Sequence, residues 1–110
     1  MQFTVCAFNE ESLIAQLSFH ENLFGKKFSV KLIRHGDGES TGNVYVLDDG
    51  VLSYRVYDTL FRFGNYGIVR IANFPLMDEY QVWKDGVKIG STNDSLEYAK
   101  VIMSRDMQYG

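Results

Sequence analysis

The sequence predicts a two-layer α+β domain in which a mostly antiparallel sheet of about five to seven strands is covered by two helices. Two segments carry apolar residues at helical spacing, and the segments between them alternate apolar and polar residues with the period of a strand. Short connections between these strand-like segments favour antiparallel pairing. The predicted order is β-α-β-β-β-β-β-β-α, and a chain of 110 residues with 45% hydrophobic content is expected to fold as a single domain over 1–110.

Capping residues mark the first helix. Residues 2–8 (QFTVCAF) predict a strand, after which Asn9 is placed to cap a helix. Glu10 and Glu11 in its first turn suit the positive end of the helix dipole, and Gly25 is placed to end it. The expected apolar face holds Leu13, Ile14, Leu17 and Phe24.

After this helix the period changes to two. Phe28, Val30 and Leu32 alternate with polar residues, and three later segments also predict strands. These segments are 43–47 (NVYVL), 51–57 (VLSYRVY) and 68–74 (IVRIANF).

Two points in this central region concern faces and turns. Within 51–57, Leu52, Tyr54 and Val56 are expected to face the helices, so that Arg55 and Tyr57 face away. Turns are expected at Gly64 and Gly67, and whether residues 60–63 pair with another strand stays open.

The hairpin near the C-terminus has the most definite geometry. Asp85-Gly86 between alternating residues predicts a type I′ turn, which needs positive φ at both central positions. Three cross-strand pairs follow: Lys84–Val87, Trp83–Lys88 and Val82–Ile89. Residues opposite each other share a face, so Val82 and Ile89 are expected to be buried and Trp83 and Lys88 to face away.

A second helix should follow this hairpin. Asp94 is predicted as its N-cap, with Glu97 three residues on. Leu96, Ala99 and either Ile102 or Met103 form the apolar stripe. Both helices are expected to cover one face of the sheet.

Composition and charge exclude several classes. The net charge of −3 gives no general attraction to nucleic acids, and the single Cys6 cannot form an internal disulfide. We expect Cys6 to be a buried strand residue. No apolar run is long enough to span a membrane and no basic leader precedes one, so a cytoplasmic protein without membrane contact is expected.

The loop DGESTGNVYVLD, residues 37–48, raises a calcium-binding alternative. Oxygen-bearing residues fall at alternate positions from Asp37, with Gly42 at the sixth and Asp48 at the twelfth. The flanks alternate with period two instead of forming helices, and a polar turn between strands explains the same residues. Calcium binding is therefore left open as an alternative.

Other metal and catalytic motifs are not indicated. His20 is expected on the polar flank of the first helix and His35 at a strand end, so neither is paired with Cys6 in a zinc-binding pattern. No nucleophile–base motif is recognisable. We therefore predict no catalytic residues, no metal and no cofactor.

Aromatic content is the unusual feature, with eight Phe, seven Tyr and one Trp among 110 residues. Phe3, Phe28 and Tyr54 are expected in the core. Strand alternation sends other aromatic and basic residues away from the helices, which predicts an open basic and aromatic sheet face. Its expected members are Lys31, Tyr45, Arg55, Tyr57, Arg70, Trp83 and Lys88. A merely solvated face explains the same pattern and is the alternative.

These features predict a non-catalytic, inhibitor-type binding protein that engages a macromolecule through that face. In composition the chain resembles small phage accessory proteins, which implies a host-interaction or anti-defence role. A protein partner is expected, either a host protein or a second copy. Binding of single-stranded nucleic acid, by stacking bases on the aromatic rings, is the alternative.

Overall fold

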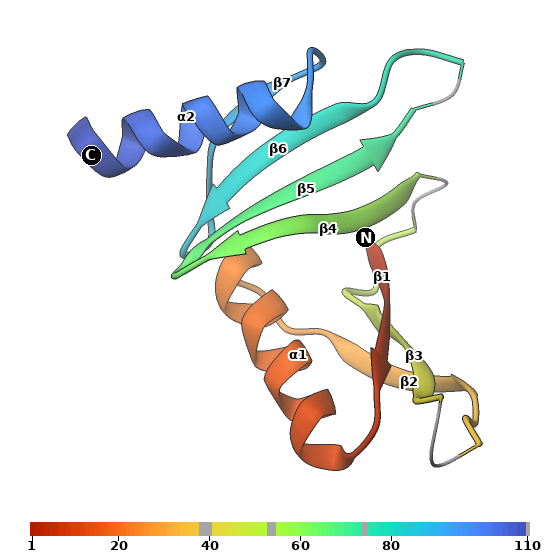
Figure 1. Ribbon diagram of the computed structural model, residues 1–110. Helices are drawn as coiled ribbons and strands as arrows, with labels where there is room; N and C mark the ends of the chain where they lie inside the picture. Colours follow the sequence, from red (N-terminus) through yellow and green to blue (C-terminus); the bar gives the residue numbers. More distant parts are fainter. Residues whose placement is uncertain (38–40, 53–54, 74, 110) are drawn as a thin grey trace.

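A computed structural model of the chain describes residues 1–37, 41–52, 55–73 and 75–109. It contains two helices and seven strands in the predicted order (Figure 1). The elements are β1 (Gln2–Ala7), α1 (Glu10–Phe24), β2 (Ser29–Arg34), β3 (Asn43–Asp48), β4 (Val56–Phe63), β5 (Tyr66–Ala72), β6 (Glu79–Lys84), β7 (Val87–Thr92) and α2 (Leu96–Tyr109).

The strands form two antiparallel sheets, where the sequence suggested one. The three-stranded sheet has the order β1-β3-β2 and the four-stranded sheet has the order β4-β5-β6-β7. Because β3 lies between β1 and β2, both of its edges are paired, and β4 begins a new sheet. The α+β class, the element order and the antiparallel pairing are confirmed.

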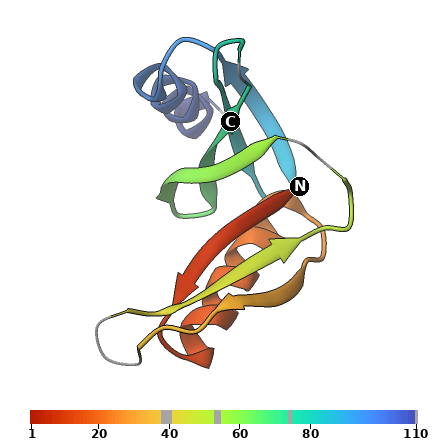
Figure 2. The same ribbon diagram turned by 90° about the vertical axis from the view of Figure 1, so that its right-hand side faces the viewer.

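The two helices lie on opposite sides of the four-stranded sheet (Figures 1 and 2). The expectation that both cover one face is therefore wrong. On the α2 side, a core cluster contains Tyr66, Ile68, Val82, Ala99 and Met103. On the α1 side, a second cluster contains Phe3, Val5, Leu23, Phe24, Phe28, Leu47 and Val69. This second cluster takes residues from both sheets and from α1, so it joins the two halves of the molecule.

The limits of α1 are as predicted. The Asn9 side chain accepts a hydrogen bond from the Ser12 backbone N–H at 2.8 Å, and Gly25 takes the left-handed conformation with φ 64°. His20 was expected on the polar flank but is only 1% exposed. Its ring contacts the Gln16 carbonyl at 2.7 Å through Nδ1 and the Thr59 hydroxyl at 3.1 Å through Nε2. The flank is buried because β4 of the second sheet packs against it.

The C-terminal hairpin has the predicted turn. Asp85 and Gly86 have φ values of 47° and 82°, as a type I′ turn requires. Lys84 pairs with Val87 and Trp83 with Lys88. A bulge then shifts the register, so Val82 pairs with Gly90 where Ile89 was expected.

Several local predictions are wrong. β4 begins only at Val56, where a strand over 51–57 was predicted, and Leu52 is 91% exposed before it. Residues 60–63, whose pairing the sequence left open, belong to β4. Ser53 and Tyr54 lie outside the described residues. Gly64 forms a turn, but Gly67 lies inside β5, where a Cβ would come within 2.6 Å of Leu23.

The start of α2 and the environment of Cys6 also differ. The Ser95 hydroxyl accepts from the Tyr98 backbone N–H at 3.1 Å, so Ser95 takes the capping position assigned to Asp94. Cys6 is exposed because the inward positions of β1 are Phe3, Val5 and Ala7.

The 37–48 segment is only partly a loop. Asn43–Asp48 forms β3, so the second half of the proposed calcium loop is an extended strand. Asp37 and Thr41 bond to each other through side chains and backbone N–H groups, each at 2.9 Å. Residues 38–40 lie outside the described part of the chain.

Candidate functional site

The structure distributes the seven predicted contact residues over several surfaces. Lys31 lies on the outer face of the three-stranded sheet, which points away from α1, and Tyr45 lies on its inner face. Tyr57, Trp83 and Lys88 belong to the α1 side of the four-stranded sheet, and Arg70 belongs to the α2 side. Arg55 precedes β4. No single basic and aromatic face is formed.

The aromatic members of the set support the core. Trp83 packs against Phe24 of α1 with ring centroids 4.9 Å apart, and its Nε1 donates to Gln81 at 2.9 Å. Tyr57 lies 5.8 Å from Phe3 between ring centroids, and Tyr45 also packs against this cluster. The prediction that these rings face away from the core is wrong, because α1 and the second sheet cover that side.

The two arginines have separate surroundings. Arg70 forms an ion pair with Asp58 on the neighbouring strand, with a distance of 2.8 Å from Nη2 to Oδ2. Arg55 and Tyr57 line a hollow of about 310 Å³ together with Asp49. Two members of the predicted set, Arg55 and Tyr57, therefore line one cavity.

Asp49 in this hollow has a structural role. It accepts from the Met1 amino group at 2.8 Å and from Lys26 at 3.2 Å. Burial alone would raise the pKa of Asp49, but hydrogen bonds from Met1, Val51 and Lys26 lower it below the ordinary 3.8. The carboxylate therefore anchors the start of β1 and is not poised to take up a proton.

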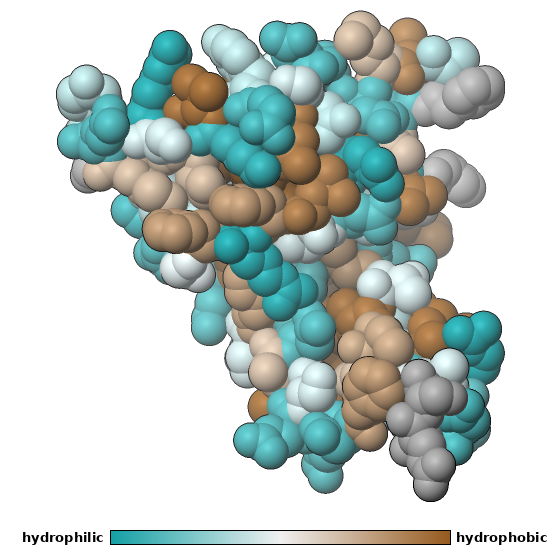
Figure 3. Space-filling view, viewed as in Figure 1, coloured by the Kyte–Doolittle hydropathy of each residue, from teal (hydrophilic) through white to brown (hydrophobic). Residues whose placement is uncertain are grey.

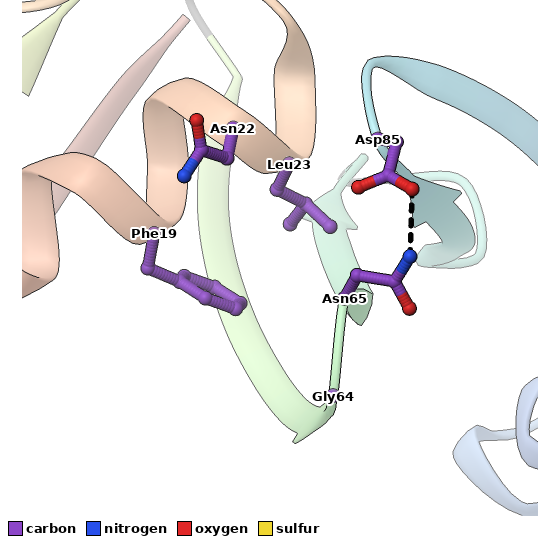
Figure 4. A pocket seen from close by; sticks show the side chains of 6 residues that line it. All are labelled: Phe19, Asn22, Leu23, Gly64, Asn65 and Asp85. Atoms are coloured by element: carbon purple, nitrogen blue, oxygen red, sulfur yellow. Dashed lines mark hydrogen bonds between the residues drawn. The ribbon is translucent and has the colours of Figure 1, made fainter.

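A cavity of about 480 Å³ lies between the C-terminal half of α1 and two hairpin turns (Figure 4). Phe19 and Leu23 of α1 point towards it, and Asn65 and Asp85 come from the turns. Asn65 donates to the Asp85 carboxylate at 2.6 Å, which ties the two turns together. Among the described lining residues, Asp85 is the one carboxylate, and no His, Lys, Cys or Ser lies beside it.

The described residues also contain no cluster of three or more His, Cys, Asp or Glu side chains that could hold a metal ion. No described helix has the length and apolar character needed to cross a membrane.

An apolar groove lies between β4 and α2. Hydrophobic side chains gather on the face of the molecule where α2 approaches β4 (Figure 3). The groove encloses about 270 Å³ and is lined by Phe61, Phe63, Lys100, Met103, Ser104 and Met107. The Lys100 Nζ lies 4.8 Å from the centroid of the Phe61 ring, and Met103 is buried. Part of the groove lining is therefore already packed within the protein.

The free edge of the three-stranded sheet is the most distinctive surface. β2 pairs only with β3 within the described residues, and all six of its residues are exposed. Three of the six are aliphatic: Val30 and Leu32 are each 38% exposed, and Ile33 is 56% exposed. An unpaired strand edge with exposed aliphatic side chains is a template for pairing with another chain.

A β-bulge determines on which face of the sheet the charged side chains of β2 lie. The pairing with β3 shifts between Leu32 and Arg34, so Lys31 lies opposite Val46 and Arg34 lies opposite Val44. Val44 and Val46 alternate with the inward Tyr45, so both belong to the outer face. Without the bulge, Arg34 would share a face with Leu32. The bulge therefore places both cations on the outer face of the sheet.

The outer face beside β2 is hollowed. A shallow cavity of about 380 Å³ is lined by Gln2, Ser29, Lys31, Ile33, Val46 and Asp48. Its one carboxylate, Asp48, accepts from Gln2 at 3.1 Å and from the Gly50 backbone N–H at 2.8 Å.

Sequence reasoning placed Lys31 outward correctly but did not single out β2. The concentration of positive charge in residues 26–35 (KKFSVKLIRH) could have pointed to this strand, because the segment holds four of the chain's 11 Lys and Arg residues and no acidic residue. The unpaired edge itself was not readable, because it depends on β3 returning between β1 and β2.

Comparisons with known proteins found no match among protein-family models, curated proteins or solved structures.

Proposed function

We propose that this chain is a non-catalytic binding protein that captures an extended segment of a partner protein along the free edge of β2. One observation carries the proposal. β2 is an edge strand of six residues, all of them exposed, and half of them are aliphatic.

An added strand would supply hydrogen-bond partners for the backbone groups at the free edge of β2. An edge strand carries a row of backbone N–H and C=O groups without sheet partners, and an added strand pairs with them. Affinity then comes from the main chain and specificity from alternate side chains. Val30, Leu32 and Ile33 supply apolar surface that a partner strand would remove from water.

Nucleic-acid binding is the second candidate, because residues 26–35 concentrate positive charge. Two features favour a protein partner. β2 has no aromatic residue on which a base could stack, and the whole chain has a net charge of −3.

Capture from native cells with two matched double variants tests the proposal. Lys31→Glu/Ile33→Glu alters the edge of the three-stranded sheet. Val87→Glu/Lys88→Glu makes the same type of change on β7, an edge of the four-stranded sheet, where Val87 is 60% exposed. We expect a partner retained by the wild type to be retained by the β7 variant and lost by the β2 variant.

Retention of the partner by the β2 variant would reject strand addition at this edge. Loss by both variants would also reject it, since the effect would then follow from net charge. Far-UV circular dichroism of both variants checks that each keeps its fold before capture.

A further inference from the structure

We infer that the segment captured by β2 is itself an amphipathic acidic strand, in which Asp or Glu alternates with aliphatic residues. This inference rests on the proposed function and specifies the chemistry of the partner. The argument comes from the two different faces that β2 offers along one edge.

The outer face of the β2 edge carries two cations, on either side of the exposed Ile33. Lys31 and Arg34 share it because of the bulge. Both side chains are exposed, and neither makes an ion pair with another described residue. By contrast, Lys26 is paired with Asp49 at 3.2 Å. The unpaired cations of this region therefore lie where an added strand would run.

The inner face of the same edge is aliphatic. Val30 lies opposite Leu47 and Leu32 lies opposite Tyr45, both of which belong to or pack against the core on the α1 side. Val30 and Leu32 remain partly exposed because, among the described strands, only β3 pairs with β2. A neighbouring strand would cover them with its own inward side chains.

These faces impose opposite requirements on alternate residues of the incoming strand. Its outward side chains meet Lys31 and Arg34 and are favoured as carboxylates, since cross-strand charge pairs stabilise a sheet. Its inward side chains meet Val30 and Leu32 and are favoured as aliphatics. Asp48, a carboxylate on the same outer face, already accepts two hydrogen bonds and lies opposite Ser29 at the far end of β2.

A second copy of the chain fits this edge less well. In a symmetric antiparallel pair centred on Lys31, the two Lys31 side chains would lie directly opposite each other. Centring on Leu32 instead brings both cations of each copy onto one shared face. Like charges directly opposite each other destabilise a sheet, which disfavours the first register, and the four cations gathered on one face repel each other in the second.

Labelled eight-residue peptides provide a direct test by fluorescence anisotropy. The probes are a Glu-Val repeat, a Lys-Val repeat, and a block peptide with four Glu followed by four Val. Two favourable cross-strand charge pairs predict that the Glu-Val repeat binds the wild-type chain about tenfold more tightly than either other peptide.

Charge reversal makes the test specific. In the variant Lys31→Glu/Arg34→Glu, the preference should invert, so that the Lys-Val repeat binds more tightly than the Glu-Val repeat. The variant Val87→Glu/Lys88→Glu also places two carboxylates on an edge strand, β7, with a charge change of −3 against −4, and should keep the wild-type preference. An inversion in the first variant alone locates the effect at the outer face of β2.

Three results would overturn the inference. The first is equal binding of the Glu-Val and Lys-Val repeats. The second is tighter binding of a thymidine oligonucleotide than of the Glu-Val repeat at low salt. The third is a wild-type dimer in sedimentation velocity that the Lys31→Glu/Arg34→Glu variant abolishes. If a captured partner is still lost from the β2 variant of the capture experiment, strand addition stands and only the acidic chemistry is rejected.

Discussion

At the scale of single residues, Trp83 shows that strand alternation predicts the face on which a side chain lies but not whether another element covers that face. Its indole lies on the opposite side of β6 from Val82, as predicted, but that side is covered by α1. We therefore expect Trp83→Ala to lower the free energy of unfolding by about 2 kcal/mol or more, because a large, partly buried ring that packs against Phe24 is removed. Chemical denaturation followed by far-UV circular dichroism measures this.

The ladder partner of Trp83 supplies the control. Lys88 is exposed on β7, so Lys88→Ala should change stability by less than about 0.5 kcal/mol. A Trp83→Ala variant as stable as Lys88→Ala would mean that the indole contributes nothing to the core.

His20 gives the protein a stability that depends on pH. Burial lowers the pKa of His20 below its ordinary value of 6.5, the Gln16 carbonyl opposes this by raising the pKa, and Arg62 adds to the lowering. The His20 ring then binds a proton more readily in the unfolded chain than in the folded chain. The contribution of His20 to the free energy of unfolding is therefore fully present above pH 6.5 and is lost as the pH falls below it.

Urea denaturation between pH 7.5 and 5 should show this decline in the wild type and a smaller one in His20→Gln. His35→Gln changes an exposed imidazole and should keep the wild-type slope. The same decline in His20→Gln as in the wild type would assign the effect to another group.

At the scale of elements, the turn between β6 and β7 is also part of a helix contact. The Gly86 backbone N–H donates to the Leu23 carbonyl at 2.8 Å, and a Cβ on Gly86 would lie 3.1 Å from the Gly25 Cα. Gly86→Ala should therefore cost more than about 1 kcal/mol, since it combines a strained positive φ with a close backbone contact.

Gly50 separates these two causes. It has a similar φ of 85°, but a Cβ there would meet nothing within 4 Å. Thermal unfolding should show a smaller loss for Gly50→Ala than for Gly86→Ala. Equal losses would mean that the contact between the turn and α1 adds nothing.

Elements fixed by local chemistry were predictable from the sequence. The cap at Asn9, the left-handed Gly25 and the Asp85-Gly86 turn depend on a few neighbouring residues, and all three are as predicted. The division into two sheets and the free edge of β2 depend on pairing between distant segments. Alternation tells which residues share a face of a strand but not what covers that face, so Tyr45 and Trp83 were misassigned.

At the scale of the whole molecule, one core cluster holds the two sheets together. Phe3 and Leu47 come from the three-stranded sheet, Phe24 comes from α1, and Val69 comes from the four-stranded sheet. His20 adds a polar link from α1 to Thr59 of β4. Neither sheet keeps its inner face covered without the other, so the two should lose their structure together.

Two single-copy residues allow this to be tested in one sample. Trp83 is the only tryptophan and reports on the four-stranded sheet, while Cys6 is the only cysteine and is exposed on the three-stranded sheet, where it can carry a fluorescent label. We expect the urea transitions followed by Trp83 emission and by the Cys6 label to coincide, as they do for a two-state domain.

The Phe24→Ala variant sharpens this prediction. Phe24 packs against both Phe3 and Trp83, with ring centroids 5.2 and 4.9 Å apart, so its removal weakens the cluster from both sides. Because the cluster is shared, both midpoints should fall together and by the same amount of urea. A label transition that separates from the Trp83 transition, in the wild type or only in Phe24→Ala, would show that the three-stranded sheet can unfold while the four-stranded sheet stays folded.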